Sequence, residues 1–262
     1  MQLSLRQQQI MALARSAEHV LVDELVAAFE VTPQTIRKDL NELCEAGMLA
    51  RVHGGALLPS GVSNVGYEQR RNMASEEKRQ IGQLCVAQIP NNSSLFINLG
   101  TTTEAVAQAL LAHQNLMIIT NNLNVANILI QNPSFEIIIA GGVLRHTDRG
   151  VIGEATVDFV KQFKLDYAVI GASALDEEGA LLDFDYREVR VTQAILENAR
   201  ERFLVTDKSK LERSAPVRVG HVSQLTSLFI DKMPSAKLAQ VCALHSVQVH
   251  SLTQSKFKNS PL

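Results

Sequence analysis

Three polar or glycine-rich segments each stand where an apolar, strand-like run gives way to a new element. They are Gly100-Thr101-Thr102-Thr103, Thr120-Asn121, and Gly141-Gly142 with Arg145 close behind. Glycine lets the backbone approach a ligand, threonine hydroxyls donate hydrogen bonds, and a helix N-terminus attracts an anion. Each segment alone could be an ordinary turn with a threonine cap. Three of them on successive strands favour a phosphate-binding site.

Two carboxylates and a lysine extend this predicted site. Asp185 and Glu188 are three residues apart at the start of a helical segment, and Lys208 follows the strand-like run that ends at Thr206. Carboxylates can hold sugar hydroxyls, and a lysine can meet a phosphate. The alternative is that the acids only interact with the helix dipole and that the lysine is a solvated surface charge. Because these residues cluster at strand ends, the sequence predicts a phosphorylated sugar or polyol as the ligand.

A second chemistry is indicated near the N-terminus, where a helix is predicted from Pro33 to about Cys44. Ile36, Leu40 and Leu43 share one face of this helix and must point inward. The side chains predicted to contact DNA lie on its opposite face and flank, or in the following hairpin: Gln34, Thr35, Arg37, Lys38, Asn41, Arg51 and His53. Long hydrogen-bonding side chains suit both base edges and phosphates.

The elements around this helix are typical of a winged helix-turn-helix. Helices are expected over 3–17 and 22–29, Thr32 and Pro33 form a good N-cap and first position of the third helix, and a Gly54-Gly55 turn indicates a short hairpin. Residues 1–57 carry five basic and seven acidic side chains, a net charge of −2, so a DNA-binding role depends on where the charges lie. A generic three-helix bundle with a solvated polar face is the alternative.

Composition sets limits on the class of protein. Of 262 residues 46% are hydrophobic, and no apolar run approaches the roughly 20 residues that span a bilayer. The cysteines Cys44, Cys85 and Cys242 are scattered, which points to a reducing compartment and argues against a disulfide framework or a zinc site. We therefore expect a cytoplasmic protein without a metal or cofactor.

The chain is predicted to contain two domains. Residues 1–57 form the DNA-binding domain, 58–75 a linker rich in turn-forming residues, 76–250 the effector domain, and 251–262 a loose tail. From residue 76 onward strand-like and helical segments alternate, which argues for a mostly parallel sheet covered by helices on both faces. In such α/β architectures ligands bind at the carboxyl ends of the strands.

The N-terminal segments 29–40 and 49–56 resemble the winged helix-turn-helix signature of the DeoR family of bacterial transcriptional regulators. The resemblance implies a DNA-binding repressor. Three positions depart from the family pattern: Thr32 replaces a usual Ser, Lys38 a commoner Arg, and Leu21 stands where a Ser or Thr would cap the second helix. Loss of that cap would cost about 1 kcal/mol of local stability.

The second domain resembles the sugar-phosphate-sensing half of the same family, whose fold is related to ribose-5-phosphate isomerase. Stretches 96–102, 120–127, 153–156 and 184–190 are similar to the branch that regulates glycerol metabolism, which implies glycerol 3-phosphate as the effector. Asn98 departs from a common Asp, and the segment from His146 to Arg149 departs from a smaller, glycine-containing stretch. Both could alter the choice of ligand.

Other functions remain open from the residues alone. A sugar-phosphate isomerase could use Glu188 or Asp185 to abstract a proton α to a carbonyl, but it would not need a fused DNA-binding domain. A DeoR-type repressor could instead answer to a different sugar phosphate, or to a protein partner. We expect a non-enzymatic repressor of operator DNA, and the resemblance implies a homo-oligomer, with a tetramer as one candidate.

Overall fold

The computed structural model describes residues 3–17, 19–46, 48–52, 54–57, 66–211, 213–232 and 235–252. The chain divides into two compact units, Met1–Val65 and Gly66–Leu262. The first is a small helical unit with a short sheet, and the second is an α/β unit. The predicted architecture is confirmed.

The described residues of the N-terminal unit form three helices and three short strands. Its elements are α1 (Leu5–Ala17), β1 (His19–Leu21), α2 (Val22–Phe29), α3 (Pro33–Glu45), β2 (Ala50–Val52) and β3 (Gly55–Leu57). The strands form an antiparallel sheet in the order β1-β3-β2. The inward face of α3 was predicted correctly, since Ile36, Leu40 and Leu43 are fully buried.

The start of α2 shows how the unit tolerates Leu21 at the N-cap. Leu21 makes no capping hydrogen bond with its side chain and instead belongs to β1, a strand that was not predicted. The backbone N–H of Val22 donates to the carbonyl oxygen of Gly54 at 2.8 Å. A carbonyl of the wing therefore satisfies a donor at the start of α2 that a Ser or Thr side chain would otherwise help to satisfy.

The C-terminal unit is built on a seven-stranded parallel sheet in the order β15-β14-β12-β9-β4-β5-β6. Its strands are β4 (Ser94–Ile97), β5 (Met117–Thr120), β6 (Glu136–Ile139), β9 (Leu165–Ile170), β12 (Ala199–Thr206), β14 (Ser227–Ile230) and β15 (Gln248–Ser251). Successive side chains of one strand point to opposite faces, so Leu95 and Ile97 pack in one hydrophobic cluster and Phe96 in another.

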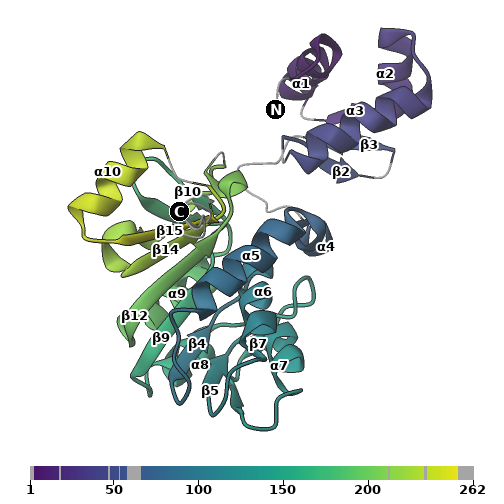
Figure 1. Ribbon diagram of the computed structural model, residues 1–262. Coiled ribbons are helices and arrows are strands. Elements are labelled where there is room, and N and C mark those ends of the chain that lie inside the picture. Colours follow the sequence, from purple (N-terminus) through teal and green to yellow (C-terminus); the bar gives the residue numbers. More distant parts are fainter. Residues whose placement is uncertain are drawn as a thin grey trace, which may run out of the picture. The chain divides into compact units, whose positions relative to one another are not determined.

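Helices cover both faces of this sheet (Figure 1). On one face lie α5 (Ser75–Val86), α6 (Thr101–Leu110) and α7 (Leu123–Leu129). On the other lie α8 (Glu154–Val160), α9 (Tyr186–Glu197) and α10 (Ala236–Leu244). None of the helices in the described ranges is long and apolar enough to cross a membrane.

Smaller elements surround the carboxyl ends of the parallel strands. An antiparallel sheet joins β10 (Ala174–Leu175), β11 (Ala180–Asp183) and β13 (Val217–His221), and β7 (Val143–Leu144) pairs with β8 (Val151–Ile152). A short 3-10 helix, Lys208–Lys210, follows β12.

The predicted linker, 58–75, differs from the structure in its second half. Tyr67–Asn72 forms helix α4, which belongs to the C-terminal unit and lies against α6. Residues 58–65, and residues 253–262 of the predicted tail, lie outside the described residues. The exact domain boundaries stay a prediction.

Candidate effector site and DNA-binding face

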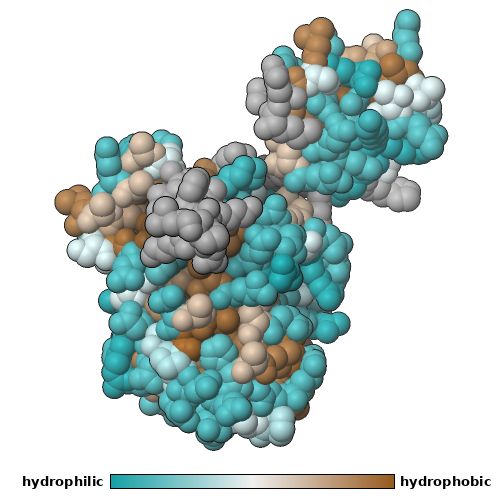
Figure 2. Space-filling model, in the orientation of Figure 1, coloured by the Kyte–Doolittle hydropathy of each residue, from teal (hydrophilic) through white to brown (hydrophobic). Residues whose placement is uncertain are grey.

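Helix α3 presents a polar face whose position follows from its cap. The Thr32 side chain accepts a hydrogen bond from the backbone N–H of Thr35, and Pro33 occupies the first turn, so the helix begins where it was predicted to begin. Four of the predicted DNA-contacting side chains are exposed on this helix: Gln34, Arg37, Lys38 and Asn41. Thr35 is half-buried, and its hydroxyl lies 2.9 Å from the hydroxyl of Thr32. The visible surface over α3 is mainly hydrophilic (Figure 2).

Two acidic residues of α3, Asp39 and Glu42, are held by the first helix. Asp39 is buried and forms an ion pair with Arg6, and Glu42 accepts a hydrogen bond of 2.6 Å from the Gln7 amide. The partners Arg6 and Gln7 were not predicted, because no local pattern links residues more than thirty positions apart. These contacts engage two of the seven acidic side chains of residues 1–57.

The hairpin that follows α3 is described only in part. Arg51 lies in β2 and is half-buried, and its Nη1 atom is buried without a hydrogen-bond partner among the described residues. His53 lies outside the described residues. The two predicted DNA contacts of the hairpin stay predictions.

A cavity opens in the C-terminal unit where β4 turns into α6. Gly100 precedes the helix with φ of 139°, a backbone conformation that residues with a side chain rarely adopt. Charged and polar side chains dominate the cavity lining, which consists of Arg70, Leu99, Gly100, Thr101, Thr102, Asp148, Gly171, Ala172, Ser173, Asp183, Glu188, Val205, Thr206 and Lys210.

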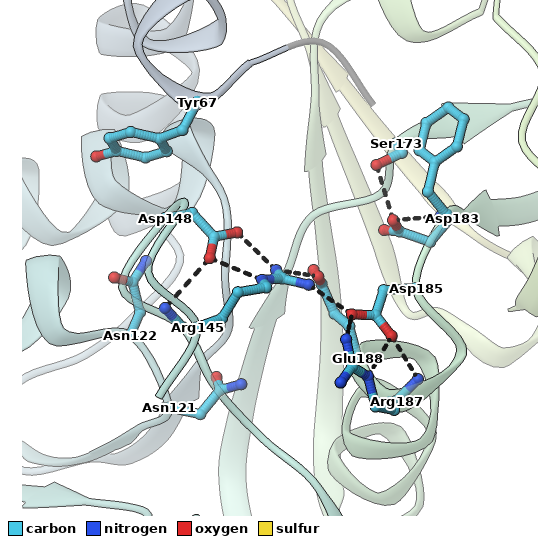
Figure 3. Close-up of polar contacts among 12 residues, drawn as sticks. Tyr67, Asn121, Asn122, Arg145, Asp148, Ser173, Asp183, Asp185, Arg187 and Glu188 are labelled. Atoms are coloured by element: carbon cyan, nitrogen blue, oxygen red, sulfur yellow. Dashed lines mark hydrogen bonds and ion pairs between the residues drawn. The ribbon is translucent and has the colours of Figure 1, made fainter. Parts of the chain in front are cut away.

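Arg145 forms ion pairs with three carboxylates in and beside the cavity (Figure 3). Its guanidinium contacts Asp148 at 2.6 Å, Glu188 at 2.6 Å and Asp185 at 2.9 Å. Arg145 therefore bridges these three carboxylates, while Asp185 is also paired with Arg187 at 2.9 Å and Asp148 lies 3.9 Å from the Arg70 guanidinium.

Burial raises the pKa of two acids that line the cavity, Glu188 and Asp183. Desolvation, reinforced by the nearby charge of Asp183, raises the pKa of Glu188 to about 7, although Arg145 opposes this shift. Desolvation also raises the pKa of Asp183, whose carboxylate accepts a hydrogen bond of 2.9 Å from the Ser173 hydroxyl. Glu188 can therefore both accept and donate hydrogen bonds near neutral pH.

Four cations lie in or near the cavity. Arg70 and Lys210 line it, and Lys78 and Arg213 lie close enough to repel the Lys210 ammonium. Desolvation, together with Arg213, Arg70 and Lys78, lowers the pKa of Lys210 to about 7, while Asp207 opposes the shift. Desolvation is also the main cause that lowers the pKa of Lys78 to about 8.

Within the described part of the chain, no carboxylate lies within 4.0 Å of the charged groups of Lys78, Lys210 and Arg213. The Nε and Nη1 atoms of Arg213 are buried there without a hydrogen-bond partner, and neither Lys78 nor Lys210 forms an ion pair within 4.0 Å. Mutual repulsion and desolvation both disfavour the charged state of such a group. An anion placed among these side chains would reverse both effects.

The structure brings part of the predicted ligand site together. Gly100, Thr101, Thr102 and Glu188 line the cavity, and the predicted residues Arg145 and Asp185 form the ion-pair network beside it.

Other predicted residues hold the backbone instead of facing the cavity. The hydroxyl of Thr103 donates to the carbonyl of Asn98 at 2.8 Å, and that of Thr120 donates to the carbonyl of Ile97 at 2.7 Å. The Asn121 amide donates to the carbonyl of Val151 at 3.0 Å. These three side chains are fully buried, so they shape the strand ends without lining the cavity.

Two further predictions differ from the observed placement. Gly141 and Gly142 are exposed and do not line the cavity; a Cβ on Gly142 would lie 2.2 Å from the Thr156 hydroxyl, so close packing explains this glycine. Lys208 is exposed, whereas Lys210 at the end of the same short helix reaches the cavity.

Several lining residues were missed. Arg70 was assigned to the linker, and Asp148 belongs to the segment singled out as a departure from the family. Asp183 and Lys210 stood beside residues that were chosen. The sequence could have indicated these residues by their charge next to a strand end. It does not show which side chains point into the cavity and which point to solvent.

Asn98, the other departure, is buried at the end of β4. The Nδ2 atom of its side chain donates to the Thr192 hydroxyl of α9 at 2.8 Å, and the Oδ1 atom of the side chain has no hydrogen-bond partner among the described residues. No metal-binding group of three or more His, Cys, Asp or Glu side chains occurs in the described ranges.

Comparison with known proteins covers both units. Residues 6–62 match the DeoR-like helix-turn-helix domain, and residues 73–232 match the DeoR C-terminal sensor domain. The chain is 49% identical over 240 residues to the glycerol-3-phosphate regulon repressor of Escherichia coli, covering 92% of this chain and 95% of that protein.

Two more similarities complete the comparison. The glycerol-3-phosphate regulon repressor of Haemophilus influenzae is 50% identical over 89% of this chain and 91% of its own length. Among solved structures, ribose 5-phosphate isomerase A of Methanocaldococcus jannaschii has a TM-score of 0.39 and 14% identity, over 53% of this chain and 55% of the isomerase.

Proposed function

This chain belongs to the DeoR family of transcriptional regulators, and from that premise we propose that it represses genes of glycerol metabolism and releases its operator when glycerol 3-phosphate binds. The observation that carries the effector assignment is the cavity at the start of α6, whose lining combines two cations, Arg70 and Lys210, with the carboxylates of Asp148, Asp183 and Glu188. Relatives of about half identity are named as repressors of the glycerol-3-phosphate regulon.

The DNA-binding half of the proposal is supported by the polar face of α3. Its exposed amide and basic side chains can reach both base edges and phosphates, and its acids Asp39 and Glu42 are held by α1. Repressors of this kind bind repeated half-sites, so we propose that the chain acts as a homo-oligomer, with a tetramer as one candidate. Operator DNA places its action in the cytoplasm.

The cations and the carboxylates of the cavity lining suit the two kinds of group that a phosphorylated polyol carries. Its phosphate would lie against Lys210, Arg70 and the backbone N–H groups at the start of α6. Its hydroxyl groups would donate to the carboxylates of Asp148 and Glu188. Inorganic phosphate would contact only the cations, and glycerol would contact only the carboxylates.

An isomerase-like activity is the second candidate, because the pKa of Glu188 near 7 suits a general base. In this protein, however, the Glu188 carboxylate is already engaged by Arg145 at 2.6 Å. We propose that it binds a hydroxyl group without abstracting a proton. Exchange of substrate hydrogens into deuterated water, measured by NMR, would reveal any proton abstraction.

Induction follows from linkage between the two sites. A ligand that binds the DNA-free state more tightly lowers the affinity for DNA by the same factor. A tenfold release requires a preference of about 1.4 kcal/mol.

The experiment is a fluorescence anisotropy titration of the full chain on labelled DNA from upstream of glycerol-metabolism genes, at one fixed salt concentration. Glycerol 3-phosphate should release the DNA, whereas glycerol and inorganic phosphate should not. Release only by another sugar phosphate would replace the proposed effector. Failure to bind DNA at all would contradict the repressor.

A further inference from the structure

Helix α4 (Tyr67–Asn72) is the first element of the C-terminal unit along the chain, and it contributes to the cavity. Arg70 of this helix lines the cavity, and its guanidinium lies 3.9 Å from the carboxylate of Asp148. Six residues make too short a helix to be stable alone, so its position depends on the contacts that fix it.

The C-terminal end of α4 is held by a cation. The Lys78 ammonium, which is buried, donates to the backbone carbonyl of Arg70 and to that of Met73 at 2.7 Å. Lys78 is also one of the cations whose charge acts on Lys210. An anion in the cavity would therefore attract the same ammonium that fixes this end of α4.

The N-terminal end of α4 is held through Tyr67. Its hydroxyl donates to the Glu104 carboxylate at 2.8 Å and accepts from the Asn124 amide at 3.0 Å. Glu104 lies in the first turn of α6, the helix whose start lines the cavity, and the Asn124 amide also donates to the carbonyl of Asp148 at 3.2 Å. Both ends of α4 are thus tied to groups that form the cavity.

We propose that α4 is the element through which the effector acts on the chain leading to the N-terminal unit, with Arg70 facing the ligand and with Tyr67 and Lys78 as positioning residues. The inference rests on the proposed function, because it assigns the route by which the same ligand causes release. A phosphate that attracts Arg70 and Lys78 changes the contacts at the C-terminal end of α4. The Tyr67 hydroxyl connects the N-terminal end of α4 to Glu104 of α6.

Tyr67→Phe tests this route, since it removes the hydroxyl and keeps the ring. We expect the variant to bind operator DNA and glycerol 3-phosphate within about threefold of wild type, while the ratio of operator dissociation constants with and without glycerol 3-phosphate falls at least fivefold. Tyr186→Phe is the matched control, because Tyr186 is 65% exposed at the start of α9. It should leave the ratio unchanged.

Hydrogen exchange of residues 66–73 in the wild-type chain gives an independent measurement that no variant can confound. Glycerol 3-phosphate should change the exchange of this segment at concentrations that release DNA. If wild type is released but exchange of 66–73 is unaltered, or if Tyr67→Phe keeps the wild-type ratio, α4 is not the route although the proposed function stands. If glycerol 3-phosphate releases no DNA from wild type, the proposed function fails and this inference with it.

Discussion

The exposed face of α3 and the lining of the cavity are both polar, but their side chains are supported in opposite ways. On α3, the side chains of Arg37, Lys38 and Asn41 are exposed, and the described part of the chain offers them no hydrogen bond or ion pair. In and beside the cavity, Asp148, Asp185 and Glu188 share the guanidinium of Arg145, and Asp185 is also paired with Arg187. A residue of the first kind can be changed without affecting the fold, whereas a residue of the second kind also contributes to stability.

Replacing Arg145 by Ala gives the largest expected effect, because it leaves three partly buried carboxylates without their shared cation. Breaking a buried ion pair by removing one partner costs about 3–5 kcal/mol, which corresponds to a decrease in Tm of roughly 10 °C for a unit of this size. Thermal unfolding measured by circular dichroism checks it. Arg187→Ala is the control, since Arg187 pairs with Asp185 but its side chain is 51% exposed. Equal Tm values for the two variants would contradict the stabilising role of Arg145 among the carboxylates of the cavity.

Lys210→Met separates ligand binding from stability within the cavity. The ammonium of Lys210 is desolvated and repelled by neighbouring cations, so its loss should not destabilise the unit. It should weaken glycerol 3-phosphate binding by about 2–3 kcal/mol, or roughly 30- to 150-fold, because a charge-assisted hydrogen bond to phosphate is lost. Isothermal titration calorimetry of the full chain measures the change. Lys208→Met removes the same charge from an exposed position two residues away, and a comparable loss there would contradict the assignment of Lys210.

The α3 face and the cavity also differ in how far the sequence predicted them. On a helix the period of 3.6 residues and the cap at Thr32 fix which side chains point outward, so Gln34, Arg37, Lys38 and Asn41 were identified correctly as exposed. The parallel sheet followed from the alternation of strand-like and helical segments. At the strand ends no period operates, and the direction of a side chain depends on contacts between segments distant in sequence.

Two pairs of neighbours illustrate this limit. Thr102 lines the cavity whereas Thr103 donates to the backbone, and Lys210 lines it whereas Lys208 is exposed. Arg6 and Asp39 illustrate the same limit in the N-terminal unit, because their ion pair joins α1 to α3 across 33 positions. Sequence patterns located these regions but not the individual contacts.

Lys38→Ala tests the exposed face of α3, whose side chains contribute little to stability. Each lost base or phosphate contact should weaken operator binding by about 1–2 kcal/mol, or roughly five- to thirtyfold, without a change in Tm. Anisotropy titrations at several salt concentrations measure the affinity and its salt dependence. Lys161→Ala, an exposed lysine at the end of α8, controls for net charge. Wild-type affinity in Lys38→Ala would rule out this lysine as a DNA contact.

The smallest predicted effect is a pH dependence confined to the cavity. The pKa of free Lys210 is lowered to about 7 by desolvation and by Arg213, Arg70 and Lys78, with Asp207 opposing, and the pKa of Lys78 is lowered to about 8. A phosphate dianion favours the protonated lysines, so binding takes up protons and the affinity for glycerol 3-phosphate should fall as pH rises from 7 to 8. Glu188, with a pKa raised to about 7, ionises over the same range and strengthens the fall by repelling the dianion.

The expected decrease is about three- to tenfold per pH unit, and titration calorimetry in buffers of different ionisation enthalpy would measure the proton uptake directly. Below pH about 6 the phosphate itself gains a proton, so the affinity should pass through a maximum. Lys210→Met should flatten the decrease above pH 7, whereas Lys208→Met should not. An affinity that is constant between pH 7 and 8 in wild type would show that the cations of the cavity are not in contact with the phosphate.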